Sequence, residues 1–180
     1  MNPTPRPRRP RPLCAPAVGW LVLALAASGC AYSTSSALLP THLKTVAVPV
    51  FENGTTEYTL EQQITDAVIA RFVNDNHLKV VDEGSADLLV KGRILGYRNA
   101  VFGFNTAVNA QEYRVTIAVS VVLKDQVKNR EIWNDGNMIR FSNYYVVDVP
   151  GDSASTELDG RKSAVDKIAE EILARTVESW

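Results

Sequence analysis

The sequence predicts an α+β domain built as a two-layer sandwich, in which a four-stranded mixed sheet carries two helices on one face. Residues 112–124 alternate apolar and polar side chains without a break, which is the period of a strand with one buried face. Residues 56–74 and 156–178 instead repeat apolar side chains every three or four positions, as helices with one buried face do. Along the chain the order is strand, helix, strand, strand, strand, helix (β-α-β-β-β-α).

The N-terminal 29 residues have the composition of a secretory signal that ends at a cysteine. Arginines come first, an apolar run over residues 13–27 follows, and two small residues precede Cys30. This order resembles the lipobox of bacterial lipoproteins, with Ala27 at a position where leucine is commonest. The resemblance implies that residues 1–29 are a lipoprotein signal peptide that is removed. It also implies that the Cys30 thiol carries diacylglycerol and that the new amine receives an acyl chain.

Two other interpretations of this segment are an ordinary signal peptide with a structural Cys30, and an uncleaved membrane anchor. A structural cysteine needs a partner, and the one other cysteine in the sequence, Cys14, lies in the segment to be removed. A membrane span needs about 20 apolar residues, whereas Pro16 interrupts this run. The lipid anchor at Cys30 therefore explains the segment best.

The chain that remains after removal of the signal is mildly acidic. The full sequence has 19 Lys and Arg and 20 Asp and Glu. The only charges of the signal are four arginines, which leaves 15 basic residues and a formal charge of −5. This balance argues against nucleic-acid binding, which needs clustered basic residues. Residues 30–42 are small and polar and predict a lipidated tether, and residues 43–180 are long enough for one domain with its own core.

The elements of the domain follow from local patterns. Residues 44–50 alternate as a half-buried strand, and Pro49 indicates that this strand ends at an edge. After the first helix we expect a short extended piece at 78–81, strands at 86–97, 112–124 and 130–141, and loops at 99–110 and 144–155. The first crossover is expected to join parallel strands and the later strands to form antiparallel hairpins. The register of residues 130–141 stays open, because Trp133 and Met138 fall on opposite sides.

The residue types give no support for an enzyme. His42 in the tether and His77 at a helix end have no Cys, Asp or Glu at the spacing of metal ligands. The sequence has no nucleophile elbow and no phosphate-binding glycine loop. We therefore predict no catalytic residue, no metal and no cofactor apart from the covalent lipid on Cys30.

Four basic residues project from the predicted open face of the sheet, opposite the core. These residues are Lys91, Arg93, Arg114 and Lys124, and strict alternation places Tyr97 beside them. Basic side chains on a polar sheet face can bind the phosphates of anionic headgroups through charge-assisted hydrogen bonds. The alternative is a solvated face whose charges prevent aggregation.

The predicted loop at 99–110 carries two aromatic residues, Phe102 and Phe104. Exposed aromatic side chains at a loop tip are typical of insertion into a partner protein or into acyl chains. The alternative is that the loop folds back and buries both rings in the core.

Four stretches in this order resemble the LptE family of lipopolysaccharide-assembly lipoproteins. They are residues 45–61, 82–92, 111–117 and 169–180. The resemblance implies a lipoprotein seated in the lumen of the outer-membrane β-barrel LptD, on the periplasmic side. There it plugs the barrel, helps to assemble it, and binds lipopolysaccharide for delivery to the outer leaflet. Ala31 after the lipidated cysteine fits sorting to the cell outer membrane.

A second family remains possible from the residues. Outer-membrane lipoproteins that activate peptidoglycan synthases also begin with a strand that reads Val-Ala-Val, followed by Phe-Glu-Asn and a helix, as residues 46–53 do here. A regulator of this kind is expected to co-purify with an inner-membrane synthase, whereas an LptE protein is expected to co-purify with a β-barrel.

Overall fold

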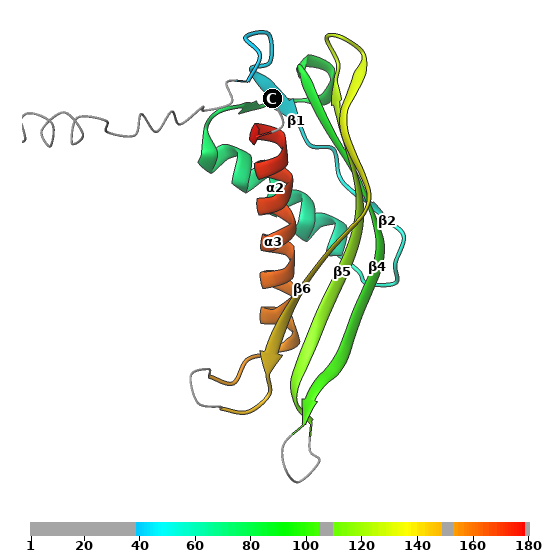
Figure 1. Ribbon diagram of the computed structural model, residues 1–180, viewed down its shortest axis with the longest axis vertical. Helices are drawn as coiled ribbons and strands as arrows, with labels where there is room; N and C mark the ends of the chain where they lie inside the picture. Colours follow the sequence, from blue (N-terminus) through cyan, green and yellow to red (C-terminus); the bar gives the residue numbers. More distant parts are fainter. Residues whose placement is uncertain (1–38, 105–109, 149–152, 179–180) are drawn as a thin grey trace, which may run out of the picture. The chain divides into compact units, whose positions relative to one another are not determined.

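The computed structural model describes residues 39–104, 110–148 and 153–178 (Figure 1). All of them belong to one compact unit, Ser36–Trp180. The predicted signal peptide, Cys30 and most of the predicted tether lie outside the described residues. In chain order the elements are β1 (Thr45–Ala47), β2 (Glu52–Asn53), α2 (Leu60–Asp75), β3 (Lys79–Val80), the short 3-10 helix η1 (Glu83–Ser85), β4 (Leu88–Phe104), β5 (Ala110–Asp125), β6 (Arg130–Tyr145) and α3 (Glu157–Glu178).

Within the described ranges the sheet has six strands, in the order β3-β1-β4-β5-β6, with β2 paired to β4. The strands β1 and β2 run parallel to β4, and β3 runs parallel to β1. The strands β4, β5 and β6 pair as antiparallel neighbours. The predicted mixed α+β class with two helices is confirmed, but the predicted number of four strands is wrong. The strands β2 and β3 have two residues each, which is too short to produce a periodic pattern in the sequence.

The strand expected over residues 44–50 is interrupted. It ends as β1 at Ala47, and the chain returns to β4 as β2 at Glu52. Pro49 lies in the gap, and proline has no amide hydrogen to donate to a ladder. The irregular backbone between β1 and β2 allows the Phe51 side chain to point into the core, where it is 2% exposed. The Phe51 amide donates to Thr65 Oγ1 of α2 at 3.1 Å.

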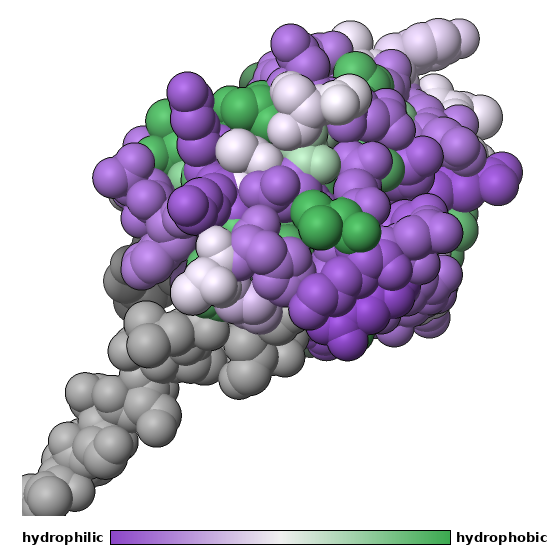
Figure 2. Space-filling view, turned by 90° about the horizontal axis from the view of Figure 1, so that it is seen from above, coloured by the Kyte–Doolittle hydropathy of each residue, from purple (hydrophilic) through white to green (hydrophobic). Residues whose placement is uncertain are grey.

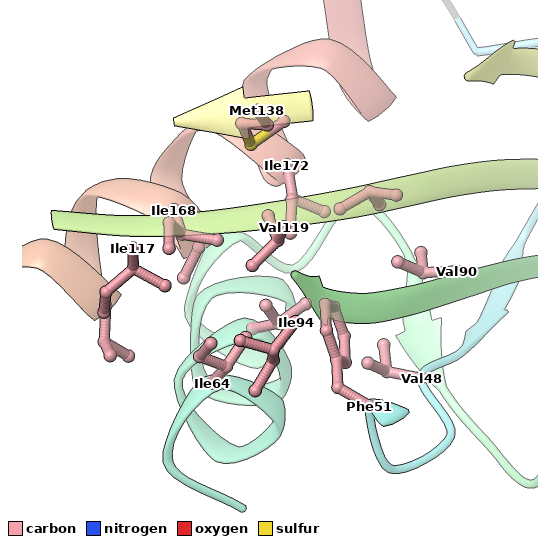
Figure 3. Packing of buried hydrophobic residues seen from close by; sticks show 14 of the residues in the cluster. Val48, Phe51, Ile64, Val90, Ile94, Ile117, Val119, Met138, Ile168 and Ile172 are labelled. Carbon is pink, nitrogen blue, oxygen red and sulfur yellow. The ribbon is translucent and has the colours of Figure 1, made fainter. Parts of the chain in front are cut away.

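Both helices cover the same face of the sheet (Figure 1). Their buried stripes meet the sheet in one core, in which Ile64 of α2 and Ile168 and Ile172 of α3 lie opposite Ile94 and Ile117 (Figure 3). The other face of β4, β5 and β6 is left open.

The helix α2 begins at Leu60, about four residues later than predicted. Thr59 adopts a φ of 66°, in the left-handed region, and this conformation does not continue a right-handed helix. The start of α3 agrees with the prediction to one residue. There Thr156 and Asp159 form a reciprocal cap, because the Asp159 carboxylate accepts from the Thr156 amide at 2.9 Å and the Thr156 hydroxyl accepts from the Asp159 amide at 3.4 Å.

An extra residue in β4 decides which of its later side chains face the helices. Ile94 pairs with Val119 and Gly96 pairs with Ala118, so Leu95 is a β-bulge. Beyond it the alternation is shifted by one position. Tyr97 therefore lies on the helix side, and its predicted place on the open face is wrong.

On the helix side, Tyr97 joins β4 to α3. Its hydroxyl donates to Glu157 at 2.5 Å and accepts from Arg161 Nε at 3.3 Å. The same arginine, whose side chain is 14% exposed, donates to Glu57 at 2.9 Å. Burial and the hydrogen bond to Glu157 raise the pKa of Tyr97 to about 12.

The long strands extend further than the sequence predicts. The strand β4 reaches Phe104 and β5 begins at Ala110, so most of the predicted loop at 99–110 is strand. The open register of β6 is settled by a second bulge, because Met138 pairs with Val119 while Asp135 pairs with Val121. The one extra residue between Asp135 and Met138 brings Trp133 and Met138 to the helix side together.

Candidate functional site

The open face of β4, β5 and β6 holds all four basic residues predicted from the sequence. Arg114 and Lys124 alternate with the buried side chains of β5, and so point away from the helices. Lys91 and Arg93 pair with Val122 and Ser120, which share that outward side. The four residues are nevertheless spread along the strands and do not form one cluster.

Acidic neighbours balance two of these residues at one end of the face. Lys91 and Lys124 line a pocket of about 560 Å³ together with Glu83 and Glu131. The Lys91 ammonium lies 3.4 Å from the Glu83 carboxylate. This end of the face therefore has little surplus positive charge for an anionic ligand.

Arg93 lies further along the face and also has an acidic neighbour. Its Nε lies 3.9 Å from Glu52, and both side chains are largely exposed. An exposed pair at this distance contributes little free energy, about 0–1 kcal/mol. The Glu52 carboxylate nevertheless reduces the local positive charge, which makes Arg93 a weaker candidate than an arginine with no acidic neighbour.

A different pair of arginines forms the cationic site of this face. Arg98 pairs across the ladder with Thr116, and Ala100 pairs with Arg114, so the two arginines are diagonal neighbours on β4 and β5. They line a pocket of about 260 Å³ whose lining residues are Arg98, Ala100, Val101, Phe102, Arg114 and Thr116. None of these lining residues is acidic. Among the described residues, no carboxylate lies within ion-pair distance of either guanidinium.

Arg114 is held in place by its neighbours. Its guanidinium carbon lies 3.5 Å from the ring centre of Phe102 on β4 and 4.2 Å from that of Phe141 on β6. Its Nε donates to Asn143 Oδ1 at 2.8 Å, and the Asn143 amide in turn donates to Glu112 at 2.6 Å. Stacking between rings and one fixed hydrogen bond orient the guanidinium before any ligand arrives.

Exposed apolar side chains surround this pocket. Phe102 is 51% exposed, Phe141 is 47% exposed, and Ile139 on the same face of β6 is 45% exposed. Phe104 is 63% exposed near the end of β4. Phe102 and Phe104 therefore belong to a strand and not to a loop, and the alternative that both rings fold into the core is wrong. We call Phe102, Phe141 and Ile139 the apolar strip.

The structure thus joins two features that the sequence presented separately, since Phe102 packs on Arg114. Sequence reasoning missed Arg98, Thr116 and Phe141. The signal for Arg98 is Gly96, because a glycine inside a strand often marks a bulge. Counting Leu95 as the extra residue moves Arg98 to the open face.

The histidines lie elsewhere. His42 Nε2 is 3.3 Å from Asp125, and His77 Nδ1 is 2.8 Å from Asp75. Across residues 39–104, 110–148 and 153–178, no group of three or more His, Cys, Asp or Glu side chains is arranged to hold a metal ion. In that same part of the chain, neither helix is both long enough and apolar enough to span a bilayer.

Comparisons with known proteins place the chain in a family. The family model LptE, described as lipopolysaccharide-assembly, matches residues 43–177. A search of curated proteins found no match. Among solved structures, a hypothetical protein from Chlamydia trachomatis is similar at 13% identity, with a TM-score of 0.52 over 74% of this chain and 95% of that chain.

Two further solved structures are more distant. PelC of Paraburkholderia phytofirmans, solved as a dodecamer, is 13% identical with a TM-score of 0.48, over 76% of this chain and 90% of that chain. Rare lipoprotein B of Shewanella oneidensis is 15% identical with a TM-score of 0.45, over 74% of this chain and 95% of that chain. The similarity to the chlamydial protein supports the fold alone. Because the family model matches residues 43–177, the chain belongs to the LptE family of lipopolysaccharide-assembly lipoproteins of the outer membrane.

Proposed function

We propose that this protein is the lipid-anchored component of a lipopolysaccharide translocon. Residues 1–29 are removed, Cys30 carries diacylglycerol and an N-acyl chain, and residues 30–42 tether the domain of residues 43–180 to the outer membrane. The domain plugs the lumen of LptD from the periplasmic side, helps to assemble that barrel, and binds lipopolysaccharide. Membership of the LptE family supports this role. The role is one of binding and requires no catalytic residue.

The observation that carries the ligand part of the proposal is the pair Arg98 and Arg114. Neither guanidinium has an acidic partner within residues 39–104, 110–148 and 153–178, so each can donate two parallel hydrogen bonds to a phosphate group. Thr116, between them, offers a hydroxyl donor. The Phe102 and Phe141 rings already fix Arg114, so binding costs little side-chain entropy there.

The apolar strip extends this site to a second kind of chemistry. Its side chains adjoin the pocket and remain exposed. A ligand that carries both phosphate and acyl chains can pair its phosphate with the arginines and lay an acyl chain on the strip. Lipopolysaccharide has both groups, which is why this face is the part of the domain that we assign to it.

The ligand part is tested by reversing charge in two matched places on the same sheet face. Arg98→Glu with Arg114→Glu is expected to weaken binding of purified lipopolysaccharide about tenfold or more, and to make the remaining binding less sensitive to salt. Lys91→Glu with Arg93→Glu is the control, because acidic side chains already lie beside both of these residues. Dephosphorylated lipopolysaccharide should bind the wild type and the Arg98/Arg114 variant alike.

Equal binding by the Arg98/Arg114 variant and the wild type contradicts this assignment. A loss confined to the Lys91/Arg93 variant moves the site to the other end of the face. Urea unfolding of both variants checks that the charge changes leave the fold intact.

The partner part is tested by purifying the detergent-solubilised protein at its native level from the outer membrane. A large β-barrel in stoichiometric amount is the expected result. An inner-membrane peptidoglycan synthase in its place supports the regulator that the sequence also resembles.

A further inference from the structure

The first residues of the domain are bound to the start of β4 through Asp87. The Asp87 carboxylate accepts hydrogen bonds from the Lys44 amide at 2.8 Å, the Thr45 amide at 3.0 Å and the Thr45 hydroxyl at 2.9 Å. The Asp87 amide donates back to the Thr45 hydroxyl at 2.9 Å. The backbone hydrogen bond from Lys44 is the main reason that the pKa of Asp87 is lowered. This reciprocal set adds to the ladder of the short strand β1 in holding residues 44–45.

A second carboxylate holds the residues just before these. Asp125, at the end of β5, has a fully buried side chain that lies 3.3 Å from His42 Nε2. It also accepts from the Lys128 amide at 2.9 Å and lies 3.7 Å from Arg130 Nε. Burial works against the charge on Asp125, but these donors and cations outweigh it and lower the pKa of the carboxyl.

Apolar contacts complete the attachment. Leu43 is buried in the main core, and Leu39 packs against the same core. The Leu43 amide donates to the Pro40 carbonyl at 2.8 Å, which makes a tight turn between them. Residues 39–45 are thus bound to β4, to the β5–β6 turn and to the core.

The Arg98–Arg114 pocket, which we propose binds lipopolysaccharide, lies at the other end of the sheet. Asp125 ends β5, whereas Arg114 and Thr116 lie nine to eleven residues earlier on the same strand. At about 3.4 Å per residue the separation is roughly 30 Å or more. Hydrophilic residues cover most of the described surface at the end of the domain near the β5–β6 turn (Figure 2). That end therefore has little apolar surface with which to fix itself to a membrane.

We infer that Asp87 and Asp125 are positioning residues for the lipid anchor. They fix the point at which the tether leaves the domain, beside the β5–β6 turn, and so hold the Arg98–Arg114 pocket at the far end of the sheet from the anchored end. This inference rests on the proposed lipidation of Cys30. Leu39 lies nine positions after Cys30, and nine fully extended residues reach at most about 30 Å. If residues 39–45 detached, the tether would gain seven residues, and the pocket could take many more positions relative to the membrane.

The first arm of the test asks whether the carboxylates hold residues 39–45. Hydrogen exchange of the Lys44 and Thr45 amides is measured in the purified protein, for the wild type and for Asp87→Ala with Asp125→Ala. We expect about tenfold faster exchange in the variant, since these amides lose their acceptor. Asp82→Ala is the matched control, because Asp82 is a nearby acid whose side chain caps no amide of η1. Asp87→Asn keeps one acceptor oxygen and should restore part of the protection.

The second arm measures the distance of the pocket end of the domain from the vesicle surface. If Asp87 and Asp125 only stabilised the fold, their removal would leave this distance unchanged. The lipidated protein is bound to phospholipid vesicles, and the distance from the vesicle surface to a dye at Val146→Cys is measured by energy transfer. Val146 is exposed and lies beside Gln111 at the start of β5, at the pocket end. The sequence has no cysteine other than Cys14 and Cys30, so this thiol is the one that reacts. We expect a narrow distance distribution for the wild type and Asp82→Ala, and a distribution about twice as broad for the double variant.

The outcomes separate this inference from the proposed function. If the double variant folds and keeps the wild-type distribution, the positioning role is wrong and the lipid anchor stands. If the Cys30→Ser variant binds vesicles as well as the wild type does, the proposed lipidation of Cys30 is wrong. The positioning role depends on that lipidation and is then wrong too. If the double variant does not fold, Asp87→Asn replaces it, and an unchanged distribution in that variant together with faster amide exchange also overturns the role.

Discussion

Gly92, the fifth residue of β4, is the glycine at which one added methyl group is expected to lower the free energy of unfolding most. A Cβ atom there would lie 1.9 Å from Cε1 and 2.2 Å from Cδ1 of the Phe51 ring. The ring would have to move by about 1.5 Å to reach ordinary van der Waals separation. Phe51 is 2% exposed and surrounded by the core, so this movement displaces other side chains. We expect Gly92→Ala to lower the free energy of unfolding by about 3 kcal/mol, at the upper end of overpacking costs.

The assay is urea unfolding of the purified protein, followed by tryptophan fluorescence and by circular dichroism. Gly96→Ala is the matched control on the same strand, because the nearest heavy atom to its new Cβ is the Ala118 Cβ at 4.0 Å. Its free energy of unfolding should stay within about 0.5 kcal/mol of the wild type.

A double-mutant cycle tests the cause. Phe51→Ala should cost about 3–5 kcal/mol through the cavity that it leaves. In the double variant the new methyl group at position 92 meets no ring. The double variant should therefore cost about as much as Phe51→Ala, with a coupling energy near 3 kcal/mol. Additive costs, or a cost for Gly92→Ala below about 0.5 kcal/mol, refute the reasoning.

Two further predictions concern pH. Because the pKa of Tyr97 is raised from 10.0 to about 12 in the fold, its contribution to stability is complete below pH 10 and is lost as the pH rises towards 12. Urea unfolding of Tyr97→Phe should lack this part of the alkaline loss, and an unchanged alkaline profile contradicts the prediction. Hydrogen bonds from Arg140 and Arg175 lower the pKa of Glu171, so its contribution is present above pH 4.5 and is lost as the pH falls through the lower value in the fold. Arg140→Ala should cost about 1 kcal/mol at pH 7 and clearly less at pH 3, and an equal cost at both pH values argues against the ion pair.

The sequence predicts most of the long elements of this fold, since their periodic patterns are local. The alternation over residues 112–124 identifies β5, and the apolar stripe around Ile168 and Ile172 identifies α3. Both patterns arise because one face of the element is buried. The short strand β2 has no pattern of its own. The strand β3 lies in the extended piece predicted at 78–81, but its two residues are too few to show that they join the sheet, where they pair with β1.

The candidate site was predicted less well, for a physical reason. Arg114 lies on the clean alternation of β5 and its face follows from counting. Arg98 lies beyond the bulge at Leu95, where counting gives the wrong face. The contact of His42 with Asp125 spans 83 positions in the sequence, and no local pattern indicates a contact at that separation.

The extra residue at Leu95 also means that a relative can keep the same pocket on a strand of different length. If Leu95 were deleted, the bulge would disappear, and plain alternation from Ile94 would still leave Tyr97 beneath α3 and Arg98 on the open face. A relative could thus have one codon fewer in this strand and the same side chains on each face. An alignment of such a relative that omits the gap would match Arg98 to a core position, and conservation scores would then hide the residues of the pocket.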